Sequence, residues 1–236
     1  MRFLSSADFL DLWERGFRLH PLDQALLILG MGLPEVSYDG LADWPLGRRN
    51  AALIELRCAC FGPHLRSWVT CPSCGEKLEC DLDGRAFTTV TAGSRKTIDP
   101  IVVNGCSYRL PTSRDLAQVA HERSPFEAAV RLVESCCMKD GEPPDLNEKE
   151  LEEVGERLAS ADPLAEILVG LRCPMCGNES SEILDIGSFF WTEIEARAKQ
   201  LLFAVHRLAE RYGWTEQEVL SLSEHRRAFY LEMVHG

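Results

Sequence analysis

Hydrophobic positions in the first sixty residues recur at the three- and four-residue spacing of amphipathic helices. This pattern predicts helices over residues 5–17 and 21–33, with a serine cap before the first and a proline in the first turn of the second. A third helix is predicted over residues 45–60, because its leucines share one face and Gly62-Pro63 ends it. The chain therefore begins as a helical region.

From residue 66 the hydrophobic period becomes that of short strands. The segments RSWVT and KLECDL flank the sequence CPSCGE, and a matching unit, CPMCGN, follows a second apolar strand about one hundred residues later. Each copy has proline after its first cysteine and glycine after its second, which is typical of a tight turn whose glycine takes a positive φ. Two cysteine knuckles between short strands are therefore expected.

A folded insert separates the two knuckles. The stretch IVVNGCSYRLP predicts a β-hairpin around Asn104-Gly105. Helices are expected over residues 113–121, 125–137 and 147–159, the last of them after a Gly-Glu-Pro-Pro loop at 141–144.

Helical periodicity resumes at Phe189 and continues to Tyr212, with one apolar stripe and Gly213 as its end. Two short helices are predicted to follow, over residues 216–220 and 224–234, capped by Thr215 and Ser223.

These elements predict an α+β fold that is mainly helical, with a split zinc-ribbon-like β module and a small β-hairpin. The expected regions are an N-terminal helical region (1–64), a split ribbon (65–187) with an inserted hairpin and helices (98–163), and a C-terminal helical region (188–236). We expect them to form one interleaved globular unit.

The charge balance argues against generic nucleic-acid binding. With 37 acidic and 25 basic residues the formal net charge is −12, and the basic residues occur as isolated pairs such as Arg95-Lys96 in a predicted loop. No signal peptide is recognisable, and no apolar run reaches the roughly 20 residues that a membrane span needs. A soluble protein of the reducing cytoplasm is expected, where structural disulfides are rare.

The ten cysteines require a chemical explanation. Two C-x-x-C knuckles can supply four thiolates to a tetrahedral zinc ion, so we expect Cys71, Cys74, Cys173 and Cys176 to hold one structural Zn²⁺. The entropic cost of bringing two distant cysteine pairs together grows only logarithmically with the length of the loop between them. The free energy of metal binding would then contribute to the free energy of folding.

Two other ligand sets and a redox function compete with this assignment. A local site would combine Cys58 and Cys60 with Cys71 and Cys74, and His64 is a candidate substitute ligand. A redox pair is the third option, although the knuckles lie between strand-like segments and not at a helix N-terminus, where thiol pKa values fall. The remaining cysteines are expected to pack in the core; they are Cys80, Cys106, Cys136 and Cys137.

No motif for a nucleophile, a phosphate loop or an open metal site occurs in the sequence, so a non-enzymatic protein without a small-molecule substrate is expected. The protein is then expected to act through contacts made by its surface. The C-terminal helices combine aromatic and flexible apolar residues of the kind found in interface hot spots. The predicted partner-binding residues are Trp214, Phe229, Tyr230 and Met233.

The C-terminal segment LLFAVHRLAERYGWTEQEVLSLSEHRRAFYLEMV resembles the baseplate hub assembly chaperone family of contractile-tailed (T-even-like) phages and related contractile injection systems. The segments LHPLDQALLIL, LGRRNAALIELR, FGP, CPSCGEKLECDLD and SFFWTEIEARAKQLL follow in that family's order, so the resemblance spans nearly the whole chain. The departures are Cys58 and Cys60, in helix positions where apolar residues are expected.

The resemblance implies a structural or assembly role in a baseplate, with other baseplate, hub or tail proteins as partners. It implies a location in the bacterial cell during assembly, with retention in the tail particle as a further option. A zinc-ribbon nucleic-acid-binding protein and a C-x-x-C redox chaperone or oxidoreductase are the alternative functions.

Overall fold

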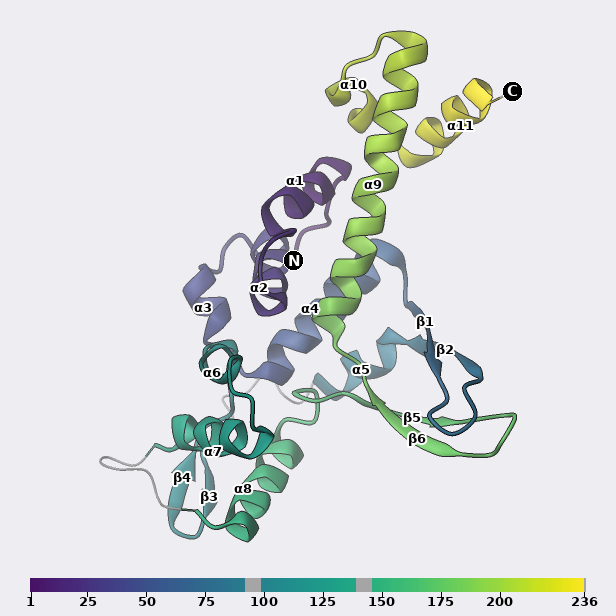
Figure 1. Cartoon of the computed structure of the whole chain (residues 1–236). Helices are drawn as coiled ribbons and strands as arrows, with labels where there is room; N and C mark the ends of the chain where they lie inside the picture. The colour runs from purple at the N-terminus through teal and green to yellow at the C-terminus, as the bar shows by residue number, and fades with distance from the viewer. Residues whose placement is uncertain (92–98, 139–145, 236) are drawn as a thin grey trace. The chain divides into compact units, whose positions relative to one another are not determined.

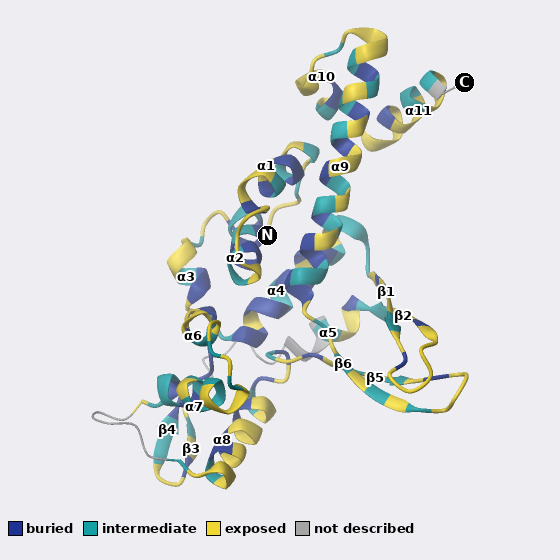
Figure 2. Ribbon diagram, in the orientation of Figure 1, coloured by how far each residue is buried: buried dark blue, intermediate teal, exposed yellow. Residues whose placement is uncertain are grey.

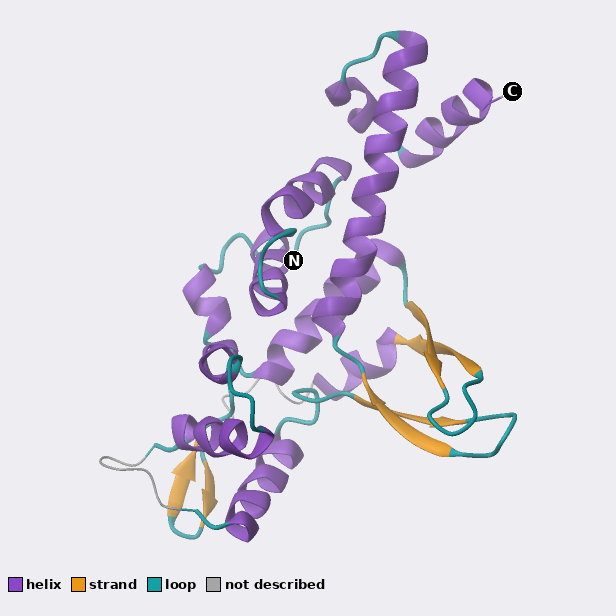
Figure 3. Cartoon of the chain, viewed as in Figure 1, coloured by secondary structure: helices purple, strands orange, loops and turns teal. Residues whose placement is uncertain are grey.

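A computed structural model describes residues 1–91, 99–138 and 146–235. The fold is α+β: it is mostly helical, with small antiparallel hairpins and a cluster of four cysteines, as the sequence predicts (Figure 3). The loop expected at 141–144 and the Arg95-Lys96 pair lie outside the described residues.

The chain forms two compact units (Figure 1). The first combines Met1–Pro34 with Gly187–Gly236, and the second is the continuous segment Glu35–Ile186. Residues 1–34 of the N-terminal helical region thus share a unit with the C-terminal helical region, while residues 35–64 belong to the other unit with the ribbon and its insert.

The first unit is helical. Ser5 begins α1 with a capping box, since its side chain accepts from the Asp8 N–H and the Asp8 carboxylate accepts from the Ser5 N–H. Thr215 and Glu218 form the same box at α10. The helices of this unit are α1 (Ser6–Gly16), α2 (Pro21–Gly32), α9 (Ile186–Tyr212), α10 (Glu216–Ser221) and α11 (Glu224–His235).

The buried residues of α9 recur with the helical repeat, so they lie along one side of the helix for most of its length (Figure 2). They are Ile186, Phe190, Trp191, Ile194, Ala198, Leu201, Ala204 and Leu208. Of the stripe predicted from the sequence, Phe190, Ile194, Leu201 and Leu208 are buried, whereas Val205 is half-buried and Tyr212 at the helix end is exposed.

The second unit contains three hairpins among its described residues. Its first part comprises α3 (Tyr38–Ala42), α4 (Leu46–Phe61), β1 (His64–Thr70), β2 (Lys77–Asp83) and α5 (Gly84–Thr91). The insert comprises β3 (Ile101–Val103), β4 (Cys106–Tyr108), α6 (Ser113–Val119), α7 (Pro125–Cys136) and α8 (Glu148–Ala161), and β5 (Leu168–Arg172) and β6 (Glu179–Ile183) follow.

The insert has its own hydrophobic core between the β3–β4 hairpin and helices α7 and α8 (Figure 1). Asn104 and Gly105 both take positive φ in the hairpin turn, as the Asn-Gly sequence predicts. The buried residues of this core are Val103, Tyr108, Leu110, Val133, Cys136, Leu151, Val154 and Leu158.

A buried polar network connects the start of α4 to the end of the insert. The Gly47 N–H donates to Asp162 Oδ2 at 2.8 Å, and Asn50 Nδ2 donates to the Leu164 carbonyl at 2.8 Å. The Arg49 guanidinium donates to Ser113 Oγ at 3.1 Å. Because these groups are buried, their hydrogen bonds hold the start of α4 against Ser113 and against the chain that follows α8.

Within the described part of the chain, no helix is both long enough and apolar enough to cross a membrane.

Candidate metal centre

Each C-x-x-C sequence forms a tight turn between two antiparallel strands. In the first turn the Cys71 N–H donates to the Glu76 carbonyl at 2.8 Å, and the Gly75 N–H donates to the Cys71 carbonyl at 3.0 Å. The second turn repeats both bonds: Cys173 donates to Asn178 at 2.8 Å, and Gly177 donates to the Cys173 carbonyl at 2.9 Å. The two knuckles therefore share one backbone design.

Glycine is required in these turns. Gly75 and Gly177 have φ values of 77° and 72°, in the left-handed region that side chains disfavour. The sequence prediction of positive φ at both glycines is confirmed.

The two knuckles meet. Cys71 Sγ lies 3.7 Å from Cys176 Sγ, and Cys74 Sγ lies 3.6 Å from Cys173 Sγ. All four sulfur atoms lie within 4.8 Å of one another. Cysteine pairs separated by 98 intervening residues thus form one cluster in space.

The cluster has a buried and an exposed side. Cys71 and Cys173 are 2% and 1% exposed and pack with Leu78, whereas Cys74 and Cys176 face solvent. Val69 and Leu171 from the neighbouring strands cover the buried side. The inner sulfurs therefore lie in apolar surroundings and the outer ones are accessible.

Backbone amides point at the sulfur atoms. The N–H groups of Cys74 and Ser73 lower the pKa of the Cys71 thiol to about 7. The Glu76 N–H also lowers the pKa of Cys74, but the neighbouring sulfurs, first that of Cys176, and partial desolvation raise it to about 12. Four thiols this close can lose their protons together only if a cation compensates the negative charge.

The sulfur positions fit a tetrahedral thiolate site. Four sulfurs about 2.3 Å from a central zinc ion are separated by edges of about 3.8 Å. Two of the separations between the knuckles, 3.6 and 3.7 Å, approach that value. The cluster could therefore accept a thiophilic ion such as Zn²⁺ after a small adjustment of the side chains.

The competing ligand sets do not assemble. Among the described residues, the four knuckle cysteines are the one group of three or more potential ligands close enough to share an ion, and neither Cys58 nor Cys60 belongs to it. His64 instead lies 3.0 Å from Asp81 Oδ1 at the far end of β1. Neither knuckle opens a helix, since the turns join β1 to β2 and β5 to β6.

The other cysteines mostly pack. Cys136 is fully buried in the core of the insert, where Cys106 and Cys137 pack partly buried against it. Burial raises the pKa of the Cys136 thiol to about 11. Cys80 is half-buried on β2.

The predicted partner-binding residues divide into two groups. Trp214 stacks on Tyr212 and meets the edge of Tyr230, with ring centroids 4.9 Å apart in both pairs, so it belongs to an intramolecular cluster. Phe229 and Met233 are 58% and 49% exposed and line a hollow with Tyr230. The hollow is also lined by His225 and Arg226, which were not among the predicted partner-binding residues.

Comparisons with known proteins give one result. No curated protein and no solved structure matches the chain. Residues 35–191 match the family described as T4 bacteriophage base plate protein. The matched segment covers most of the chain and includes α4, both knuckles and the insert. The chain belongs to this phage baseplate protein family.

Proposed function

We propose that the chain is a non-enzymatic structural or assembly protein of a contractile tail or injection-system baseplate, stabilised by a single structural Zn²⁺. The observation that carries the zinc proposal is the four-sulfur cluster of Cys71, Cys74, Cys173 and Cys176. Family membership supports the baseplate role. The hub assembly chaperone role is the more specific form of this proposal.

A four-thiolate site is suited to structure and not to reaction. Four protein ligands complete the tetrahedral shell of zinc, so no position remains for water or substrate. The ion would fasten the β1–β2 hairpin to the β5–β6 hairpin and close the chain around the insert. The working surfaces of the protein would then be its exposed faces, and its partners other baseplate, hub or tail proteins.

The outer face of the β1–β2 hairpin favours a protein partner over a nucleic acid. Arg66 lies 3.2 Å from Asp81 Oδ2, so a carboxylate already compensates this cation. Lys77 lies over the Trp68 ring at 3.9 Å, and Glu79 is paired with Trp68 in the strand register. Mixed charges of this kind do not form the basic track that phosphate backbones require. The proposal therefore includes no nucleic acid as a partner. As expected from the sequence, it also includes no membrane insertion and no small-molecule substrate.

Co-purification tests the proposed function. The tagged full-length chain is expressed with the tail proteins encoded beside it, and complexes are isolated from the cytoplasmic fraction and from finished particles. We expect a stable complex with at least one baseplate or hub protein, together with one zinc per chain. Recovery of no tail protein contradicts the baseplate role, and the two fractions distinguish an assembly factor from a retained subunit.

The same protein distinguishes the alternatives. Salt-sensitive retention on heparin supports nucleic-acid binding, whereas flow-through contradicts it. Reduction of insulin disulfides by the purified chain supports redox activity. A tightly held zinc without insulin reduction excludes it.

A further inference from the structure

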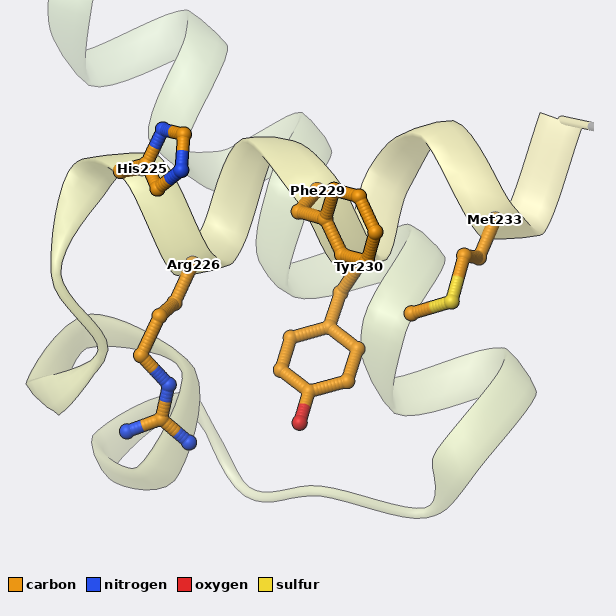
Figure 4. A pocket seen from close by; sticks show the side chains of 5 residues that line it. All are labelled: His225, Arg226, Phe229, Tyr230 and Met233. Atoms are coloured by element: carbon orange, nitrogen blue, oxygen red, sulfur yellow. The ribbon is translucent and has the colours of Figure 1, made fainter.

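One side of α11 carries a continuous stripe of side chains. His225, Phe229 and Met233 follow one another at four-residue steps, and Arg226 and Tyr230 lie beside them. These five residues line a shallow hollow of about 390 Å³ (Figure 4). Spacings of three, four and seven residues are those of a helix that meets a partner helix along its length.

Contacts within the first unit hold α11 in place. Arg227, which is 4% exposed, donates to Ser6 Oγ at 3.2 Å and reaches the carbonyl groups of Val219 and Leu222. This arginine therefore joins α11 to α10 and to the start of α1. A helix fixed in this way loses little conformational freedom when its outer side is covered.

Aromatic packing fixes the edge of the stripe. Tyr230 meets Trp214 edge to face at 4.9 Å and Tyr212 at 5.9 Å. The ring is thereby held between the intramolecular cluster and the hollow. In Figure 4, Arg226, Tyr230 and Met233 extend from the same side of the helix.

The stripe has a positive end and an apolar end. Glu224 lies 2.9 Å from Arg197, so this carboxylate is already paired. The Arg226 side chain is exposed and makes no ion pair within the described residues. It also lies in the first turn of α11, where the helix dipole adds positive potential. Glu232, two turns further on, does not line the hollow.

On these observations, and on the assumption of the proposed function, we infer that the α11 stripe binds an amphipathic helix of another tail protein. The apolar side of that helix covers Phe229, Tyr230 and Met233, and an acidic residue at one end pairs with Arg226. Charge complementarity selects this occupant: a basic or neutral helix leaves the exposed guanidinium without a partner.

A tiled peptide array tests the inference. Peptides of about 18 residues, long enough for five helical turns, are tiled across the tail proteins encoded beside this chain and probed with the full-length protein. The test variants are Phe229→Ser, Met233→Ser and Arg226→Glu. Phe203→Ser is the matched control, because Phe203 is an exposed phenylalanine (53%) on α9 that lies outside the hollow.

We expect the array to identify acidic amphipathic peptides whose affinity for the full-length chain falls about tenfold or more with each test variant, as for interface hot spots. The control variant should bind like the wild type. Replacing the peptide's acidic residue with lysine should restore binding to the Arg226→Glu variant. Circular dichroism of each variant verifies that its helices are retained.

Several outcomes overturn the inference: an array without bound peptides, preferred peptides that are basic, or equal loss with Phe203→Ser. A concentration-dependent dimer that Met233→Ser abolishes would assign the stripe to a second copy of the chain instead. If a baseplate complex forms equally well with all three test variants, the proposed function stands and the α11 interface fails.

Discussion

Removal of the metal should unfold the two knuckle hairpins and leave the insert folded. The perturbation is either a strong zinc chelator or the Cys74→Ser variant, which changes an exposed ligand with little change in volume. The affected strands are β1, β2, β5 and β6. The comparison region is the core between α7 and α8, which contains no knuckle cysteine.

The magnitude of the effect follows from how little apolar surface the two hairpins bury around the sulfur cluster. Their shared cluster contains Leu78 and the two inner cysteines, with Val69 and Leu171 only partly buried. Burial of one leucine contributes about 1.5–3 kcal/mol, and an isolated two-stranded hairpin is marginally stable in water. A structural zinc contributes on the order of 10 kcal/mol. The metal therefore supplies most of the stability of this module.

Hydrogen exchange followed by mass spectrometry measures the effect on the full-length chain. The amides of Cys71 and Cys173 donate to the carbonyl groups of Glu76 and Asn178 in the folded knuckles. After metal removal we expect peptides containing these amides to lose protection by about 100-fold or more, equivalent to about 2.8 kcal/mol. Peptides from α8 should exchange as before.

A matched cysteine variant completes the experiment. Cys80 lies on β2, half-buried and outside the sulfur cluster, so Cys80→Ser should leave the exchange of the knuckle amides unchanged. The reasoning is refuted if the knuckle amides stay protected in the metal-free protein. Equal losses in Cys74→Ser and Cys80→Ser would refute it as well.

Three further perturbations test the packing of the two units. A Cβ at Gly47 would overlap the buried Asp162 carboxylate, so Gly47→Ala should lower the free energy of unfolding by about 1–3 kcal/mol. Urea titrations measure this change, and an unchanged unfolding midpoint would contradict it. Desolvation disfavours the ionised Asp115 carboxylate, but hydrogen bonds from Arg109 and Thr112 outweigh this effect and lower the pKa of Asp115 to about 2. The lowered pKa contributes about 2 kcal/mol to the free energy of unfolding above pH 4, and this contribution is lost as the pH falls toward 2. Asp115→Asn should remove this part of the pH dependence, and a parallel pH profile for the two proteins would contradict it. Arg227→Ala should speed hydrogen exchange in α11 while α9 is unchanged, because its hydrogen bonds to α10 and Ser6 are lost, and equal protection in the variant would show that they do not hold the helix.

Most helices were predictable because their ends carry local signals. Ser5, Pro21 and Thr215 mark helix starts in the sequence, and each starts or caps a helix in the structure. The unpredicted α3 spans five residues, too few to show a hydrophobic period. The start of α5 had a signal that was missed: Asp83 accepts from the Arg85 N–H at 3.0 Å, directly after β2.

The knuckle turns could also be predicted from short stretches of sequence. The packing of segments that are distant in the sequence could not. The proline, glycine and cysteine spacing determined both turns, so their backbone hydrogen bonds could be anticipated from one short motif. No local signal showed that residues 1–34 share a compact unit with the C-terminal helices, since that depends on which apolar sides meet. For the same reason Arg226 became a candidate interface residue only when the structure placed it beside Phe229.

X-ray absorption at the zinc edge, combined with metal analysis of the purified full-length chain, tests whether the four knuckle cysteines hold a zinc ion. The four-sulfur cluster predicts one zinc per chain with four sulfur ligands at about 2.3 Å. A correctly folded protein without metal, or a zinc ion with nitrogen or oxygen ligands in place of the four sulfurs, would contradict it.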